Sequence, residues 1–284
     1  MQLLTPTSAK YFCGTFTGNA ASSKLSIKEF LGKQPRTKRI YQEGTPSYSL
    51  LHDCILREAD RSLFLSNSLY ATALQGNRES NSWWGHVTLY YSAFFAARGL
   101  LAMHGGWIND KDYWLQVTNS TPGAITLEVN RTAHPQLTTQ SAKSTHKAFW
   151  KVFYWAVRSL HTHAPNNLAF ALNPVQSRDS WLIDTRNELN YQPSKAFDSI
   201  EDFITGFNPT SIPNSLPKHW VVIHNTTSAL IELAIKWKLN YNLSADVLIN
   251  HFPTLNDAST AIIKFPRNSA LDTYAHQRIQ GLPL

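Results

Sequence analysis

The sequence has 284 residues, of which 43% are hydrophobic and 12% aromatic, so it can bury a continuous core and is not an intrinsically disordered chain. The 26 lysine and arginine residues outnumber the 19 acidic ones, and the resulting charge of +7 favours an anionic partner. Because charged residues make up only 16% of the chain, an extended and highly charged surface is excluded. Composition therefore predicts a globular protein of one large domain or two small ones.

The cysteine content and the apolar runs of the sequence indicate the cellular compartment of the protein. Cys13 and Cys54 show neither metal-ligand spacing nor a disulfide framework, so we predict two buried thiols in a reducing compartment. The first residues do not resemble a secretory signal, which favours the cytoplasm. Residues 80–97 contain no charged side chain, but polar residues such as His86 and Ser92 interrupt the run. We therefore predict a buried helix there and no membrane partner.

Residues 1–45 show no sustained periodicity. Within them, the segment 24–39 carries six basic residues beside the single acid Glu29, namely Lys24, Lys28, Lys33, Arg36, Lys38 and Arg39. They are predicted to form a basic, loop-rich arm. Two interpretations stay open for this arm. It is either a tail that contacts phosphates or a solvated segment that packs loosely over the core.

Two long helices are predicted next, over about 46–75 and 81–104. In the first, apolar residues from Leu50 to Leu69 recur at helical intervals. The second has an apolar stripe and ends at Gly105–Gly106; the stripe comprises Trp84, Val87, Tyr91, Phe94 and Leu101. Arg98 lies on the same stripe, where its guanidinium needs an acidic partner or a wet cleft.

The periodicity then changes. The runs 113–117 and 124–129 alternate like strands around a turn, which predicts a β-hairpin inserted near 107–135. A helix over about 142–160 follows and ends at His161 and His163. Because no third ligand stands nearby, we interpret these histidines as a C-terminal helix cap and predict no metal site.

Further helices are predicted over 175–191, 197–207 and 220–237, with shorter pieces near Val247 and Ala261. The fold class is mainly α. A helical core over 46–207 carries the hairpin, and a C-terminal helical extension over 208–284 packs on that core. Phosphate-binding loops, zinc-protease helices and Gly-x-Ser-x-Gly turns are absent from the sequence.

Two segments together suggest a family. They are WWGHVTLYYSAFFAARGLLAMHG at 83–105 and RNELNY at 186–191. Over roughly 46–207 the chain resembles bacterial HEPN-domain proteins. The resemblance implies a helical bundle, frequently a homodimer, that binds RNA or another protein. Many members are metal-independent endoribonucleases, so it also implies that no cofactor is needed and suggests a toxin or phage-defence role.

The motif of that family is an Arg, often followed by Asn, with a His four to six residues later. Arg186 and Asn187 match it, and Tyr191 stands where the His is expected. By resemblance these three residues form the catalytic site, with Arg98, Tyr91 and His86 in support. Arg186 would stabilise charge on a phosphate while a base deprotonates the ribose 2′-hydroxyl. Tyrosine titrates near pH 10 in model peptides, so at this position it suits proton donation or RNA binding better than general-base catalysis.

Alternatives to a nuclease stay open. His86, His104, His146 and His224 are candidate replacements for the missing base. A second hypothesis is a non-catalytic HEPN-like module that dimerises and binds a nucleic acid, nucleotide or protein. A third is an interaction protein that uses only its aromatic helices. In a purely structural interpretation, Arg186 pairs with Asp184 or Glu188 and Tyr191 covers the helix end.

Overall fold

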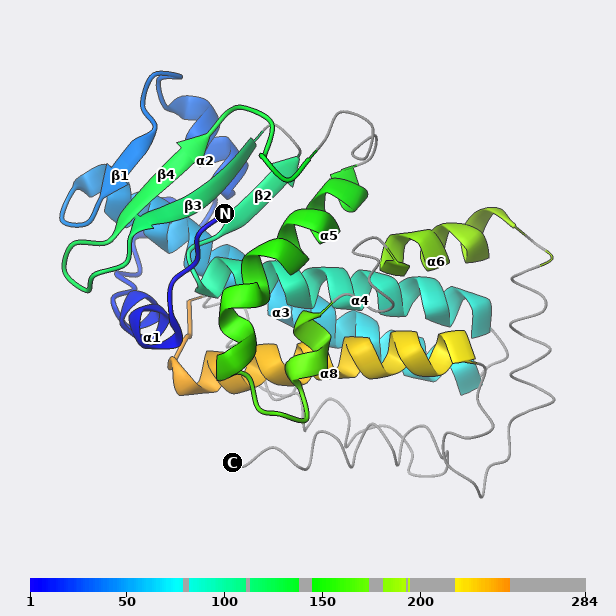
Figure 1. Cartoon of the computed structure of the whole chain (residues 1–284). Coiled ribbons are helices and arrows are strands. Elements are labelled where there is room, and N and C mark those ends of the chain that lie inside the picture. Colours follow the sequence, from blue (N-terminus) through cyan, green and yellow to red (C-terminus); the bar gives the residue numbers. More distant parts are fainter. Residues whose placement is uncertain are drawn as a thin grey trace. The chain divides into compact units, whose positions relative to one another are not determined.

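The computed structural model describes residues 1–78, 82–110, 113–137, 145–173, 181–192, 194 and 218–245. As predicted, the described chain is mainly helical and includes a small antiparallel sheet (Figure 1). The helices are α1 (Pro6–Gly14), α2 (Ile27–Lys33), α3 (Pro46–Arg78), α4 (Ser82–Met103), α5 (Thr145–Ala156), α6 (Trp181–Tyr191) and α8 (Lys218–Asn240). The strands are β1 (Ile40–Gln42), β2 (Trp107–Asp110), β3 (Tyr113–Asn119) and β4 (Thr126–Asn130).

The chain divides into two compact units. Among the described residues, unit 1 holds those of Met1–Ser62, Ala97–Ser180 and Trp237–Val247, and unit 2 holds those of Leu63–Ala96 and Trp181–Lys236. The sequence predicted instead an arm, a core over 46–207 and an extension from 208. The division differs because α3, α4 and α8 each contribute residues to both units.

Unit 1 contains the sheet, in the order β1-β4-β3-β2 with every pair antiparallel. The predicted hairpin is present as β3 and β4, and β2 and β1 extend it on either side (Figure 1). Alternate residues Leu115, Val117, Leu127 and Val129 are fully buried, as expected for a sheet with one face on the core. The predicted insertion is therefore half of a larger sheet.

The N-terminal segment is folded rather than loop-rich, so that prediction is wrong. It forms α1, α2 and β1, and Leu4, Phe12 and Leu31 are fully buried. A capping box between Ser26 and Glu29 fixes the start of α2. The helices have 9 and 7 residues, too few for a sustained helical period to emerge from the sequence.

One edge of α3 in unit 1 is buried and charged. Asp53 accepts hydrogen bonds from the Thr17 N–H, the Thr17 hydroxyl and the Asn19 N–H at 3.0, 2.7 and 2.7 Å. One turn later Arg57 donates to the Ser22 hydroxyl and the Ala245 carbonyl, both at 2.8 Å. Asp60 pairs with Lys238 and accepts from the Ala245 N–H at 3.0 Å. This edge fastens the loop after α1 and the turn after α8 to α3; it comprises Asp53, Arg57 and Asp60.

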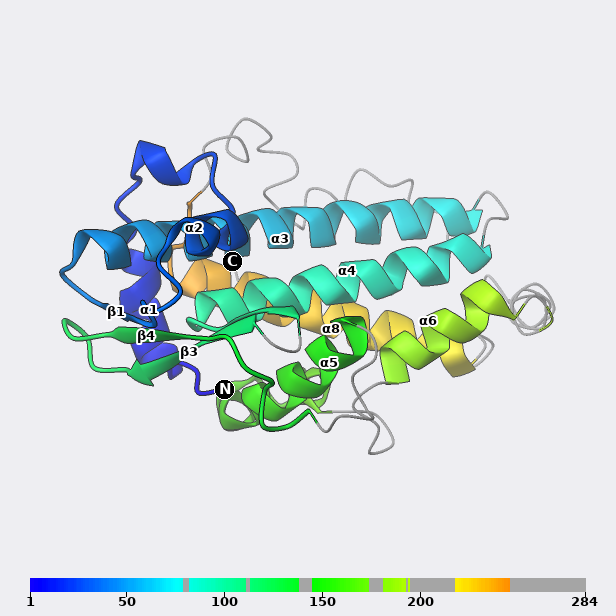
Figure 2. The same cartoon turned by 90° about the horizontal axis from the view of Figure 1, so that it is seen from above.

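In unit 2, α3 and α4 lie side by side (Figure 2). Ser66 and Ser92 are fully buried, and each hydroxyl donates to the other residue's carbonyl, at 2.8 and 2.7 Å. Because serine is small, the two helices can approach closely at this point. The Thr227 hydroxyl of α8 donates to the Leu89 carbonyl of α4 at 3.4 Å, which ties α8 to the same pair.

The ends of the predicted helices agree in part with the structure. The helix expected over 142–160 is described from Thr145 as α5 and continues from Val157 as a 3-10 helix that ends at His163. A further 3-10 turn follows at Ala169–Leu172. The predicted helix at 197–207, the start of the 175–191 helix and the pieces near Val247 and Ala261 lie outside the described residues. In the described part of the chain, no helix combines the length and apolar character needed to cross a bilayer.

The stop predicted at Gly105–Gly106 is confirmed. Gly105 has a φ of 75°, its N–H donates to the Ala102 carbonyl at 3.0 Å, and the Gly106 N–H donates to the Leu101 carbonyl at 2.8 Å. This is the Schellman arrangement, which favours glycine at the left-handed position. A Cβ at Gly105 would also lie 2.8 Å from Cγ2 of Val117 on β3.

We expect Gly105→Ala to lower the free energy of unfolding by about 2 to 4 kcal/mol, because it combines a left-handed backbone with an overlap against β3. Chemical denaturation measures this loss. Gly123→Ala is the matched control, since its φ is 84° but a Cβ there meets no atom within 4 Å. It should cost only about 1 to 2 kcal/mol. If the two variants lose the same free energy of unfolding, the added Cβ at position 105 does not strain the contact with Val117 on β3.

Candidate functional site

The RNELNY segment lies on α6 in unit 2, where the sequence predicted a helix. Leu182 and Ile183 are buried and anchor the start of this helix. The side chains of Asp184, Arg186 and Asn187 are partly exposed, and Tyr191 is 72% exposed at the helix end. The helix therefore presents its motif residues toward solvent while its first turn is packed.

Arg186 is held by two hydrogen bonds. Its Nη2 donates to the Tyr91 phenol oxygen on α4 at 2.9 Å, and its Nη1 donates to Oδ1 of Asn187 at 3.0 Å. The guanidinium carbon also lies 5.6 Å from the centre of the Tyr91 ring, within cation–π range. These contacts fix the guanidinium against α4.

Tyr191 completes this cluster. The centre of its ring lies 5.8 Å from the guanidinium carbon of Arg186, although residues five apart on a helix are offset by about 140°. The long arginine side chain closes that gap. Arg186, Asn187, Tyr91 and Tyr191, here named the Arg186 cluster, thus bring together the three predicted site residues and one of the three supporting residues.

The Arg186 cluster leaves donor capacity on the guanidinium. A guanidinium has five N–H groups, and the two hydrogen bonds above occupy one on each Nη. Nε is buried and makes no hydrogen bond within the described residues. Because Nε is buried, the spare donor capacity for a dissolved ligand is the second N–H of each Nη. A cation with spare planar donors suits a phosphate or a carboxylate.

The other two supporting residues lie elsewhere. His86 is fully buried in α4, so its imidazole is not placed to reach a hydroxyl on a dissolved substrate. Arg98 belongs to unit 1, where it pairs with Glu58, a carboxylate that also accepts from the Trp107 indole at 3.3 Å. The acidic partner expected for Arg98 is therefore present, and the structure gives neither residue a place in the Arg186 cluster.

Of the remaining histidine candidates, His104 is the one whose surroundings the structure defines best. His104 is fully buried in unit 1, where Nδ1 lies 2.8 Å from the Leu4 carbonyl and burial lowers the pKa of the imidazole to about 4. His146 lies on α5 in unit 1, and the side chain of His224 is outside the described residues. Within the described part, no group of three His, Cys, Asp or Glu side chains is arranged to hold a metal ion.

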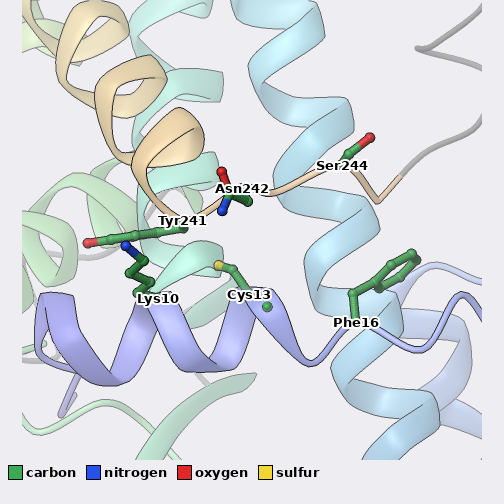
Figure 3. Close-up of a pocket in the computed structure, with 7 residues that line it drawn as sticks. Lys10, Cys13, Phe16, Tyr241, Asn242 and Ser244 are labelled. Carbon is green, nitrogen blue, oxygen red and sulfur yellow. The ribbon is translucent and has the colours of Figure 1, made fainter.

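Unit 1 has a separate cavity of about 410 Å³ between α1 and the turn after α8 (Figure 3). Its lining comprises Lys10, Cys13, Gly14, Phe16, Tyr241, Asn242 and Ser244. Burial raises the pKa of the Cys13 thiol, which leaves it protonated and a poor nucleophile. Burial likewise raises the pKa of Cys54 to about 12. Both cysteines are buried thiols, as predicted.

Sequence reasoning missed two features of unit 1. The cavity joins residues 10–16 to residues 241–244, and no local pattern links segments so far apart. The buried charges of α3 did have a local signal, because Asp53, Arg57 and Asp60 follow the i, i+4, i+7 spacing of one helix face. That spacing was overlooked because the apolar residues of the same helix define a more obvious period.

Comparison of the chain with protein-family models, curated proteins and solved structures finds no match.

Proposed function

We propose that this protein acts on RNA as a HEPN-like helical module of a toxin or phage-defence system, and that the Arg186 cluster is its RNA-binding site. The observation that carries the proposal is the guanidinium of Arg186 fixed between Tyr91 and an exposed Tyr191. A fixed cation suits a phosphate, and an exposed aromatic ring suits an unpaired base. The net charge of +7 supports an anionic partner.

Each residue then has a defined task. Arg186 donates the second N–H of each Nη to phosphate oxygens, while Tyr91 and Asn187 hold its side chain in place. Tyr191 offers one face for base stacking, which is worth about 1 to 3 kcal/mol per base. None of these tasks requires a metal ion or cofactor.

Endoribonuclease activity is the second candidate, and the proximity of Arg186 to Tyr191 favours it. In the chemistry that the family resemblance implies, the ribose 2′-hydroxyl attacks the adjacent phosphate and the 5′-oxygen of the next nucleotide leaves. Arg186 would stabilise the charge that develops on the phosphate oxygens, and Tyr191 would donate a proton to the leaving oxygen. The deprotonating base is then a residue other than those of the Arg186 cluster, or water.

Arg186→Ala is expected to weaken RNA binding at least tenfold, because a charge-assisted hydrogen bond contributes about 1.5 to 3 kcal/mol. Fluorescence anisotropy with a labelled single-stranded RNA in EDTA measures the affinity. Arg158→Ala, which removes an exposed arginine of unit 1, is the matched control and should bind like wild type. Circular dichroism confirms that both variants are folded.

The same samples, incubated with total cellular RNA in EDTA, test cleavage. Fragments from wild type but not from Arg186→Ala would support the nuclease candidate. Binding without fragments would support the non-catalytic module. If wild type fails to bind RNA, or if Arg186→Ala binds as tightly as wild type, the Arg186 cluster is not an RNA site.

A further inference from the structure

α4 is buried almost all round, which makes its few solvent-reaching positions informative. From Trp84 to Leu100 the side chains not fully buried recur every three or four residues: Trp84, Thr88, Tyr91, Phe95 and Arg98. They form a single stripe along the helix. In the apolar stripe predicted from the sequence, Val87, Phe94 and Leu101 are in the core, whereas Trp84 is exposed. The exposed large apolar side chain of α4, Trp84, therefore lies on this stripe.

The stripe is continuous with the Arg186 cluster. Tyr91, at its centre, accepts the hydrogen bond from Arg186. Both views show α6 alongside the first half of α4, with the C-terminal end of α6 toward the N-terminal end of α4 (Figure 1, Figure 2). Tyr191 ends α6, and Trp84 lies in the first turn of α4. They are 72% and 52% exposed.

We infer that the stripe from Trp84 to Tyr91 is a track for a single strand of RNA, in which Trp84 stacks on a second base beyond the one held by Tyr191. This inference rests on the proposed function of the Arg186 cluster. An aromatic ring exposed alone is unremarkable on a protein surface. Exposed aromatic rings beside a fixed arginine are instead the combination that binds single-stranded nucleic acid.

Helix geometry sets the length of RNA that this track needs. Trp84 and Tyr91 are seven positions apart on α4, which corresponds to about 10 Å at the helical rise. Stacked nucleotides are spaced by about 3.4 Å, so Trp84 adds affinity only for a strand of roughly three or more nucleotides. A duplex keeps its bases paired and stacked on each other, so it has no free base face for Trp84.

The test compares Trp84→Ala, Trp84→Phe and Arg186→Ala with wild type. Anisotropy is measured with a labelled single-stranded hexanucleotide, a dinucleotide and a duplex. We expect Trp84→Ala to weaken hexanucleotide binding roughly tenfold and to leave dinucleotide and duplex binding unchanged. Trp84→Phe, which keeps a stacking ring, should restore most of the hexanucleotide affinity. Arg186→Ala should weaken binding of all three RNAs.

Phe170→Ala removes an exposed aromatic of unit 1, 38% exposed, and is the control that should bind like wild type. If Arg186→Ala weakens binding and Trp84→Ala does not, the track is refuted and the RNA site stands. If Trp84→Ala weakens the binding of all three RNAs equally, Trp84 does not act as a second stacking site for longer single strands, and the track is also refuted. If it leaves RNA affinity unchanged but converts a dimer to a monomer in light scattering, the stripe is a protein interface instead.

Discussion

Asp53→Ala should lower the free energy of unfolding by about 2 to 4 kcal/mol, because it removes the acceptor of three hydrogen bonds from a fully buried position. Burial by itself raises the pKa of this carboxyl. Hydrogen bonds from His52, Thr17 and Asn19 outweigh that effect, so the pKa lies below its ordinary value. The folded protein therefore stabilises the carboxylate, and denaturation at neutral pH should reveal its loss.

The pH dependence of this loss provides a second check. A carboxyl whose pKa is lowered by folding stabilises the protein above its ordinary value of about 4, and the contribution disappears as the pH falls through the folded pKa. The difference in unfolding free energy between wild type and Asp53→Ala should therefore become smaller as the pH falls below about 4. Thr17→Val, which loses a single side-chain hydrogen bond, should cost about 1 kcal/mol. If Asp53→Ala lowers the free energy of unfolding by no more than Thr17→Val does, the loop after α1 does not depend on this carboxylate.

His104 should make the protein sensitive to acid. Burial is the main cause that lowers its pKa to about 4 from 6.5; donation to the Leu4 carbonyl partly opposes the effect, and His163 adds to it. Because the unfolded chain binds a proton near pH 6.5 and the folded chain does not, stability is complete above pH 6.5. It should fall by about 3 kcal/mol as the pH drops toward 4, at about 1.4 kcal/mol per pH unit.

His104→Asn keeps an N–H donor for the Leu4 carbonyl but cannot titrate in this range. Its unfolding free energy, measured by urea denaturation from pH 7 to pH 4, should fall less steeply than that of wild type. His163→Asn changes an exposed histidine and should keep nearly the wild-type slope. His134 has a pKa that burial lowers to about 4 as well, so His104→Asn should retain part of the slope. Parallel curves for His104→Asn and wild type would contradict the assignment.

Much of the fold could be predicted from local patterns. The long helices α3 and α8 and the β3–β4 hairpin carry periodicities over many residues that reflect which face is buried, and the mainly apolar composition of α4 predicts a helix that is buried almost all round. The stop at Gly105 could also be predicted, because a left-handed helix cap favours glycine wherever it occurs. The N-terminal helices could not, because short helices gain their stability from packing rather than from their own period.

The candidate site was predictable only in part. The motif comparison identified Arg186, Asn187 and Tyr191, and Tyr91 was named beside them, but spacing alone left Arg186 and Tyr191 on different faces of a helix. The structure brings the two side chains within 5.8 Å through the length of the arginine, and the arginine is fixed by the hydrogen bond that it donates to Tyr91 on α4. The same structure buries His86 and pairs Arg98 with Glu58.

By itself, then, the sequence determined the helical class, the hairpin and the residue types of the RNA-binding proposal, because these depend on neighbours a few positions away. Only the tertiary structure decided which charged groups are partnered, which aromatics reach solvent and how the chain divides into two units. Those properties depend on contacts between residues 40 to 188 positions apart, such as Arg98 with Glu58 and Arg57 with Ala245. No local period encodes such contacts, since burial and pairing are settled only when distant segments pack together.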